Sequence, residues 1–209
     1  MLGSAGITNI RFKIGQPVEA NSNFTDVQVL TELNAAVKDV ARALKYPTRI
    51  TTISGGSVAQ QQEYDLEDRT LEVIEVTYNS VVIENQPWRE AKLKTGNADG
   101  VVVYATPSSY YLVSKTKIGF IDIPAESGDV ILVLNSYEPA DIISTENIPY
   151  NEENLCELVC LRATIRLLQP QAKDEAAFWM PQYSEALSSA QIDVKNREGV
   201  DYVRNMDYE

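Results

Sequence analysis

The hydrophobic pattern of this chain changes its period twice, from helical to β and back to helical, and this change constrains the fold more than any other feature. Residues 26–45 repeat apolar side chains every three or four positions, which predicts one amphipathic helix. Its apolar stripe consists of Leu30, Leu33, Val37, Val40 and Leu44. Thr25 is a suitable N-cap and Pro47 ends the helix, so the sequence predicts both boundaries.

A short helix is also predicted at the start of the chain. Ile7, Ile10 and Ile14 recur there at helical spacing. Pro17 and the polar residues 21–23 favour a loop after it. The chain therefore begins with two helices joined by a short connection.

Residues 48–139 have a different character, because β-branched runs alternate with turn residues. The predicted strands are Arg49–Ile53, Leu71–Tyr78, Val81–Ile83, Val101–Tyr104, Tyr110–Val113, Lys117–Ile123 and Val130–Leu134. The intervening turns are short, which favours hairpins and an antiparallel sheet. Residues 87–94 could form a helical turn between two strands.

The last of these runs is apolar on both faces. Val130, Leu132 and Leu134 point to one side of the strand, and Ile131 and Val133 point to the other. A strand with two apolar faces is covered on both sides. Either helices of the same chain or a neighbouring subunit could provide the second cover.

The last third of the chain is predicted to be helical again. Asn151 can cap a helix that ends near Leu168, and a proline separates it from a second helix over 173–195. The second helix carries a narrow apolar seam formed by Ala176, Met180, Tyr183, Leu187, Ala190 and Val194. Pro181 lies inside this helix, which predicts a kink. The residues after Arg197 are polar and acidic without periodicity, which predicts an extended tail.

These patterns together predict an α+β fold. The long N-terminal helix and the two C-terminal helices form a helical bundle, and an antiparallel β-rich region is inserted into it. The expected segments are 1–47 (N-terminal helical), 48–139 (β-rich insertion), 140–197 (C-terminal helices) and 198–209 (extended tail).

The composition excludes several classes of enzyme. The chain contains no histidine, which removes the Ser-His-Asp triad, the Cys-His pair and the His-based zinc hydrolases. Its two cysteines, Cys156 and Cys160, lie four residues apart on a predicted helix, a spacing that favours buried free thiols over a disulfide. A zinc site would need further ligands. The composition thus makes an enzyme less expected but leaves carboxylate and Ser-Lys chemistry open; our expectation is a protein without catalytic residues, metal site or cofactor.

Acidic residues exceed basic ones, and the excess is uneven. The net charge is −12, yet residues 1–50 contain six Lys and Arg against four Asp and Glu, a balance of +2, which leaves −14 for residues 51–209. Sequence-specific DNA binding needs clustered Lys and Arg. An acidic surface can still border DNA by repelling it, or can serve solubility alone. No apolar run is long enough to span a bilayer, and the first residues do not have the pattern of a signal peptide.

No short motif indicates a ligand. The acidic cluster Glu63, Asp65, Glu67 and Asp68 does not have EF-hand spacing and is expected to be an exposed loop. No spacing among the carboxylates selects a glycosidase pair. Gly55-Gly56-Ser57 lacks the lysine of a phosphate-binding loop and is expected to be a turn. Scattered tryptophans and tyrosines favour core and interface anchors.

The order of these features resembles the phage head–tail adaptor (head-completion) proteins over most of the chain. The matching segments are Thr25-Asp26 with Leu30 to Ala36, Gln61-Gln62-Glu63-Tyr64-Asp65-Leu66, Leu71–Tyr78, Tyr110–Val113, Lys117-Ile118-Gly119-Phe120, Ile123 to Gly128, Tyr137-Glu138-Pro139, Leu155 to Leu168, Ala176 to Trp179 and Tyr183 to Leu187. Two departures are Glu67, which replaces the usual proline, and Pro181, which interrupts a helix that is usually continuous.

The resemblance implies a structural virion protein at the head–tail junction, assembled in the host cytoplasm, that forms a ring, commonly dodecameric, beneath the portal protein. The C-terminal segment would reach toward the portal and the β region toward a downstream tail or connector protein, while genomic DNA passes through without specific binding and no membrane is involved. The candidate interface residues are Tyr202, Tyr208, Arg204, Trp179, Tyr110 and Tyr111. Two other classes remain open: another tail-completion or assembly protein, and a carboxylate-dependent hydrolase.

Overall fold

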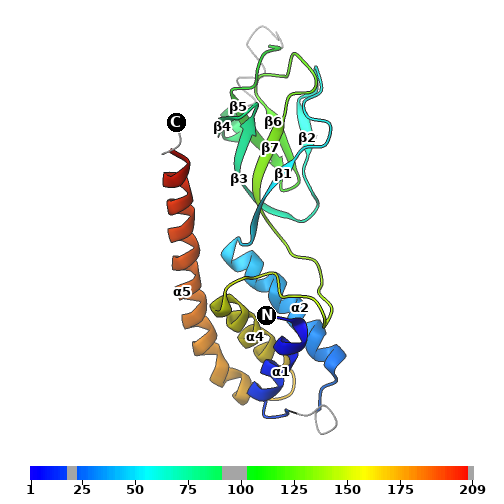
Figure 1. Cartoon of the computed structure of the whole chain (residues 1–209), viewed down its shortest axis with the longest axis vertical. Helices are drawn as coiled ribbons and strands as arrows, with labels where there is room; N and C mark the ends of the chain where they lie inside the picture. Colours follow the sequence, from blue (N-terminus) through cyan, green and yellow to red (C-terminus); the bar gives the residue numbers. More distant parts are fainter. Residues whose placement is uncertain (18–22, 91–102, 207–209) are drawn as a thin grey trace. The chain divides into compact units, whose positions relative to one another are not determined.

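The computed structural model describes residues 1–17, 23–90 and 103–206, and for residues 197–206 it gives the backbone alone. The chain divides into two compact units (Figure 1). The helical unit comprises Met1–Pro47 and Pro139–Glu209, and the β unit comprises Thr48–Glu138. Each unit has a hydrophobic core of its own.

The described part of the helical unit contains α1 (Gly3–Lys13), α2 (Asp26–Leu44), α4 (Glu153–Leu168) and α5 (Lys173–Met206). Four residues of the stripe predicted for residues 26–45 are buried on the inner face of α2, namely Leu33, Val37, Val40 and Leu44. Leu30 is half-buried, and the fully buried Val29 was not part of the prediction. The buried residues of α4 lie around most of its circumference, because α1, α2 and α5 all pack against it. This arrangement places α4 at the centre of the helical core.

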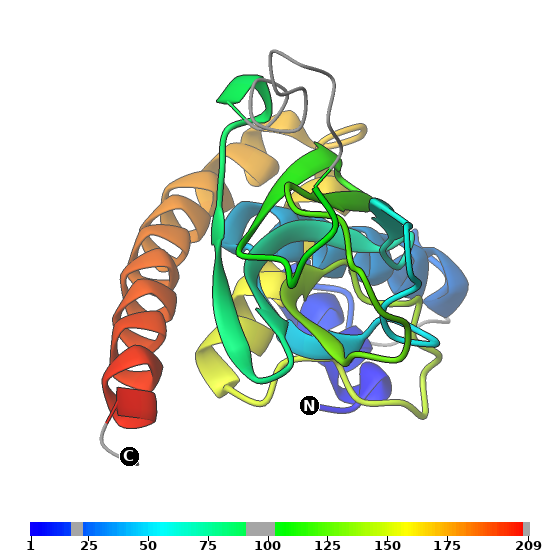
Figure 2. The ribbon, with the colours of Figure 1, turned by 90° about the horizontal axis from the view of Figure 1, so that it is seen from above.

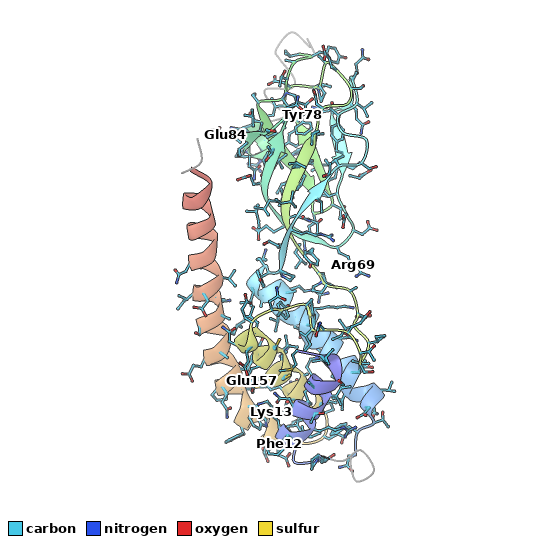
Figure 3. All side chains as sticks on the ribbon, in the orientation of Figure 1. Phe12, Lys13, Arg69, Tyr78, Glu84 and Glu157 are labelled. Atoms are coloured by element: carbon cyan, nitrogen blue, oxygen red, sulfur yellow. The ribbon has the colours of Figure 1, made fainter. Side chains whose placement is uncertain are left out.

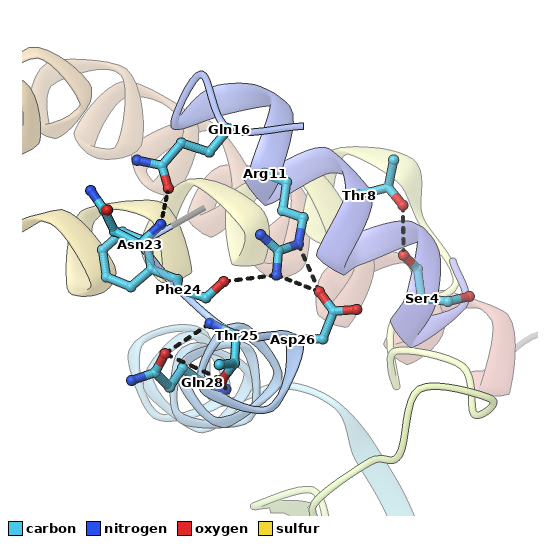
Figure 4. Close-up of polar contacts among 9 residues, drawn as sticks. All are labelled: Ser4, Thr8, Arg11, Gln16, Asn23, Phe24, Thr25, Asp26 and Gln28. Atoms are coloured by element: carbon cyan, nitrogen blue, oxygen red, sulfur yellow. Dashed lines mark hydrogen bonds and ion pairs between the residues drawn. The ribbon is translucent and has the colours of Figure 1, made fainter. Parts of the chain in front are cut away.

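The boundaries of α2 confirm the sequence prediction. The Thr25 side chain accepts a hydrogen bond from the Gln28 amide at 3.3 Å, and the Gln28 side chain accepts one from the Thr25 amide at 2.8 Å (Figure 4). This reciprocal pair is a capping box, which satisfies two amides that the first helical turn leaves without partners. Lys45 ends the helix in the left-handed conformation.

Two predictions at the ends of the C-terminal helices are corrected. The N-cap of α4 is Glu152, not Asn151, and its side chain makes no capping hydrogen bond. The segment expected to be an extended tail is helical as far as Met206, since α5 continues without a break, and residues 207–209 lie outside the described residues. The sequence after Arg197 has no apolar stripe and so did not predict a helix. Helical geometry nevertheless propagates into it from the preceding part of α5.

The β unit contains β1 (Thr48–Thr52), β2 (Glu63–Asp65), β3 (Thr70–Tyr78), β4 (Val81–Asn85), β5 (Ser109–Ser114), β6 (Lys117–Phe120) and β7 (Ile131–Tyr137). They form one sheet with the strand order β1-β7-β3-β4-β5-β6-β2. Seen from above, the sheet curls around its own interior (Figure 2). The interior holds Tyr64, Val76, Tyr78, Phe120 and Ile131 among other buried side chains.

The expected fold class, a helical bundle with an inserted antiparallel β-rich region, is wrong. The seven strands form a mixed sheet, because β4 and β5 pair in parallel through Glu84–Ser109 and Asn85–Tyr110. A parallel pair needs a crossover connection of about a dozen residues or more, and residues 86–108 supply it. In addition, β7 lies between β1 and β3, a long-range pairing that local turn signals do not encode.

Most of the predicted strands are present, and two segments differ from the prediction. The predicted strand Val101–Tyr104 lies partly outside the described residues, and Tyr104 forms an isolated bridge to Ile123. The short strand β2 was expected to be an exposed loop. Its middle residue, Tyr64, is buried, while Glu63 and Asp65 are exposed. Tyr64 is thus the residue that anchors this short strand in the core of the sheet.

Candidate interaction surfaces

Two of the tyrosines predicted as interface anchors are buried within the β unit. Tyr110 is 2% exposed and belongs to the core of the sheet. Tyr111 is 4% exposed, lies over Gly119 of β6, and packs against Trp88 with ring centroids 5.1 Å apart. Burial raises the pKa of both phenols, and the nearby Glu75 and Glu63 carboxylates add to the rise. Within this chain, both tyrosines therefore stabilise the fold.

Trp179 lies at the edge of the helical core and is half-buried. The Lys13 ammonium lies 5.3 Å from the centre of its ring, and Lys13 also pairs with Glu157 of α4 (Figure 3). This cation–π contact and ion pair join α1, α4 and α5. The neighbouring Phe178 points outward, so Trp179 secures α5 while Phe178 is available to a partner.

The remaining predicted residues lie at the C-terminus. Tyr202 and Arg204 fall on the last turns of α5, where the backbone alone is described, and Tyr208 lies outside the described residues. The structure does not bring these residues together with Trp179, which is more than five turns earlier on the same helix.

A groove lies between α1 and α2, with a volume of about 590 Å³. Ile7 and Leu30 contribute apolar surface to it, together with the strongly exposed Val27. Arg11 lines it as well, and its guanidinium donates to the Asp26 carboxylate at 2.7 Å and to the Phe24 carbonyl at 2.9 Å (Figure 4). This contact joins α1 to the start of α2. The Asp26 carboxylate in the groove is therefore already paired with Arg11.

A hydrogen-bond network fixes the loops at one end of the β unit. The Tyr78 hydroxyl donates to Asp129 at 2.6 Å, and the Asn79 amide donates to the other carboxylate oxygen at 2.7 Å. Ser57 is fully buried and donates to the Glu126 carbonyl at 3.0 Å. Burial raises the pKa of Tyr78 to about 12, with the hydrogen bond to Asp129 adding to the shift, and the two donors lower the pKa of Asp129. The network is structural, because each donor and acceptor is engaged within the loops.

The sheet presents an exposed apolar surface on the side opposite its interior. The strand registers place Ile50, Thr52, Leu132, Leu134, Thr77 and Val82 on this side, together with the carboxylates Glu75 and Glu84. We call this set the outer sheet face. Ile50 is 68% exposed and Val82 is 56% exposed, whereas Leu132 and Leu134 are half-buried between them. The two-sided apolar pattern of β7 therefore persists in the folded unit, and the described residues of that unit leave Ile50 and Val82 on its second side largely exposed.

The solvent-facing side of α5 is also poor in charge. Ala176 and Ala190 pack into the helical core and Val194 is buried, while Phe178 and Ile192 on the other side are 63% and 59% exposed. Between residues 176 and 192 the single charged side chain is Glu185. A helix face in contact with water alone normally carries more charge. This side of α5 is a second candidate surface.

Five cations of the described helical unit are held in ion pairs that join its elements. The pairs are Arg11–Asp26, Lys13–Glu157, Lys38–Asp141, Arg162–Asp39, Arg166–Asp39 and Arg166–Glu32. The hydrogen bonds to Glu32 and Asp39 raise the pKa of Arg166 against an opposing effect of desolvation. Exposed carboxylates such as Glu153, Asp174 and Glu175 extend beyond these pairs, consistent with the net charge of −12.

The described residues offer no metal centre and no membrane span. No group of three or more Cys, Asp or Glu side chains in the described part of the chain is arranged to hold a metal ion. Lys117 lies within 3.7 Å of Glu63 and 3.4 Å of Asp65, so part of the acidic cluster is neutralised locally. Among the described helices, none combines the length and the apolar character that crossing a bilayer requires. Cys156 and Cys160 are free and buried, as predicted.

Comparison with known proteins places this arrangement in a family. None of the curated proteins matches the chain. The family model described as SU10 adaptor protein matches residues 7–204, which includes most of α1, every described element from α2 to α4, and α5 as far as Arg204. This is a family of phage head–tail adaptors. The chain therefore belongs to the SU10 adaptor protein family, as a structural protein of the bacteriophage head–tail junction.

Proposed function

We propose that this chain is one subunit of a ring that joins the portal of a phage head to the tail and forms part of the DNA conduit. Membership of the adaptor family supports the setting. The observation that carries the proposal is the presence of two unlike exposed apolar surfaces, the outer sheet face and the solvent-facing side of α5. A head-to-tail contact uses two different surfaces of each copy, and repeating it generates a ring when the rotation closes.

The partners of the ring are the portal protein on one side and a downstream tail or connector protein on the other. The end of α5, with Tyr202, Arg204 and Tyr208, is proposed to contact the portal, and the β unit is proposed to contact the next tail component. The ring is expected to be dodecameric. Large exposed side chains such as Phe12, which is 79% exposed, are available for such contacts.

The negative charge suits a channel that DNA traverses. A carboxylate repels a phosphate by about 1 kcal/mol at a few ångströms in water, and salt screens the effect over ~8–10 Å. Only residues close to the passing DNA would therefore contribute. We propose that part of the acidic set of residues 51–209 lines the channel, which predicts that the purified protein does not retard DNA in a gel at physiological salt.

In the direct test, purified protein is added to phage particles that contain the portal but not this protein. Mass photometry and electron microscopy of the particles should show a ring at the portal vertex and renewed attachment of tails. Particles that gain no density at this vertex would contradict the proposal. Density on an isolated tail instead of the portal would favour a different tail-completion protein.

A further inference from the structure

We propose that α5 of one copy of this chain lies across the outer sheet face of a second copy, with Lys195 facing Glu75 and Glu84. The inference rests on the proposed function, because it names the contact between neighbouring copies of the ring. It assigns a partner to both candidate surfaces at once.

The outer sheet face needs a cover of apolar character. Leu132 and Leu134 form a central strip on β7, flanked by Ile50 on β1 and Val82 on β4. The two flanking side chains are largely exposed to solvent. A sheet with apolar side chains on both faces is stable when a second layer, usually helices, covers the outer one.

Two carboxylates lie beside this apolar strip. Glu75 and Glu84 flank the paired residues Val76 and Ile83 on the opposite side of the strands, so the register places them next to each other on the outer face. Figure 3 marks Glu84 at this side of the β unit. Neither carboxylate forms an ion pair with any residue in the described part of the chain. Like charges at neighbouring cross-strand positions oppose folding, and a cation from a partner would relieve the repulsion.

The solvent-facing side of α5 has the complementary chemistry. Ile192 is exposed, and Lys195 follows it by three residues, so an apolar side chain and a cation lie one turn apart on neighbouring parts of one helix face. Lys195 is exposed and has no ion-pair partner among the described residues. Ile192 can contact the apolar strip while Lys195 reaches the carboxylates.

The length of α5 supports a contact outside its own core. Val194 is the last buried residue among the side chains that the structure describes in α5. The helix continues to Met206, about 18 Å further. Helices in proteins gain most of their stability from packing, so a second copy beside α5 would stabilise this long helix.

The second copy is the occupant that accounts for both surfaces. One chain carries the acidic apolar sheet face and the helix with the matching lysine, so identical copies can satisfy each other around a closed ring. A foreign protein would cover one surface and leave the other exposed.

Charge reversal in separate chains tests the contact. The sheet variant carries Glu75→Lys and Glu84→Lys, and the helix variant carries Lys195→Glu. Each variant alone should incorporate into portal-containing particles ~10-fold less well than the unaltered chain, since like charges then meet at every interface. An equal mixture should recover to within about 3-fold, because alternating copies restore opposite charges at each contact.

Two control variants separate this effect from net charge. Glu126→Lys changes an exposed loop of the β unit, and Lys173→Glu changes the first turn of α5. Both should incorporate normally. Full incorporation of the sheet and helix variants, or a mixture as poor as each variant alone, overturns the proposal, and the second result would indicate a contact within one chain or with another protein.

Cross-linking gives a readout that does not depend on the portal. One chain carries Val82→Cys, a second carries Ile192→Cys, and Cys156 and Cys160 are buried. Mild oxidation of the concentrated mixture should give a mixed disulfide-linked dimer, and its absence counts against the contact. If the unaltered protein never joins the particles but the cross-link forms, the proposed function fails while the contact between copies stands.

Discussion

Gly119 on β6 shows how one residue without a side chain determines local packing. A Cβ atom at this position would lie 2.3 Å from Cζ of the Tyr111 ring, far inside van der Waals contact. The ring therefore occupies the space that glycine leaves open, and it reaches Trp88 from there. The small cluster of Tyr111, Ile121 and Val113 depends on this arrangement.

Replacement of Gly119 by alanine should destabilise the β unit. The added methyl group forces the Tyr111 ring out of its place, and overpacking of this kind costs about 1–3 kcal/mol. Denaturant unfolding followed by circular dichroism measures the change. The variant Gly119→Ala with Tyr111→Ala should show a smaller loss than the sum of the two single changes, because the clash is removed. Additive losses would contradict the packing described.

The pKa of Tyr78 makes the stability of the β unit depend on pH in the alkaline range. Its pKa rises from 10.0 to about 12 in the fold, so the neutral phenol is favoured there. The stabilisation is therefore complete below pH 10 and is lost as the pH rises through about 12. Tyr78→Phe should destabilise the unit by about 1 kcal/mol near pH 8 through loss of the hydrogen bond to Asp129. The difference between the two proteins should shrink between pH 10 and 12, and a constant difference would exclude this explanation.

At the level of elements, the sequence predicted those helices and strands whose stabilising contacts lie between residues close together in the chain. The stripe and cap of α2 were sufficient to place it, because Thr25 and Gln28 form the capping box within one turn. The parallel pairing of β4 with β5 could not be predicted, since it depends on contacts across residues 86–108. Tyr110 and Tyr111 were predicted at an interface from residue type alone, and their burial depends on the curled sheet. The outer sheet face could be anticipated from the sequence, because apolar residues occupy both faces of β7.

Pro181 offers a test of α5 as an element. It lies inside the helix, where it removes the hydrogen bond to the carbonyl of Ala177, and its side chain is exposed. Pro181→Ala should stabilise the helical unit by up to ~3 kcal/mol, measured by thermal unfolding. If the proline also sets the direction of α5, the same variant should incorporate less well into particles despite its greater stability. Equal or lower stability would show that the surroundings of residue 181 already compensate for the proline.

At the scale of the whole molecule, the chain is one unit inserted into another. The β unit is continuous in sequence, whereas the helical unit is assembled from residues on both sides of it. Thr48 pairs with Ser136, so the two ends of the β unit lie on adjacent strands. Separate cores allow each unit to present its own surface to a different partner, which suits an adaptor.

Residues 48–138 should therefore fold when expressed alone. Their core includes Val76, Phe120, Ile131 and Val133, all fully buried, and every sheet pairing among the described residues joins two strands of this unit. We expect a cooperative thermal transition and a β-type circular dichroism spectrum for the isolated segment. Val133→Asp places a carboxylate in this core and should abolish the transition, whereas Val82→Asp on the outer sheet face should preserve it. If residues 48–138 remain unfolded while the whole chain folds, the β unit depends on the helical unit, and the two surfaces cannot act independently.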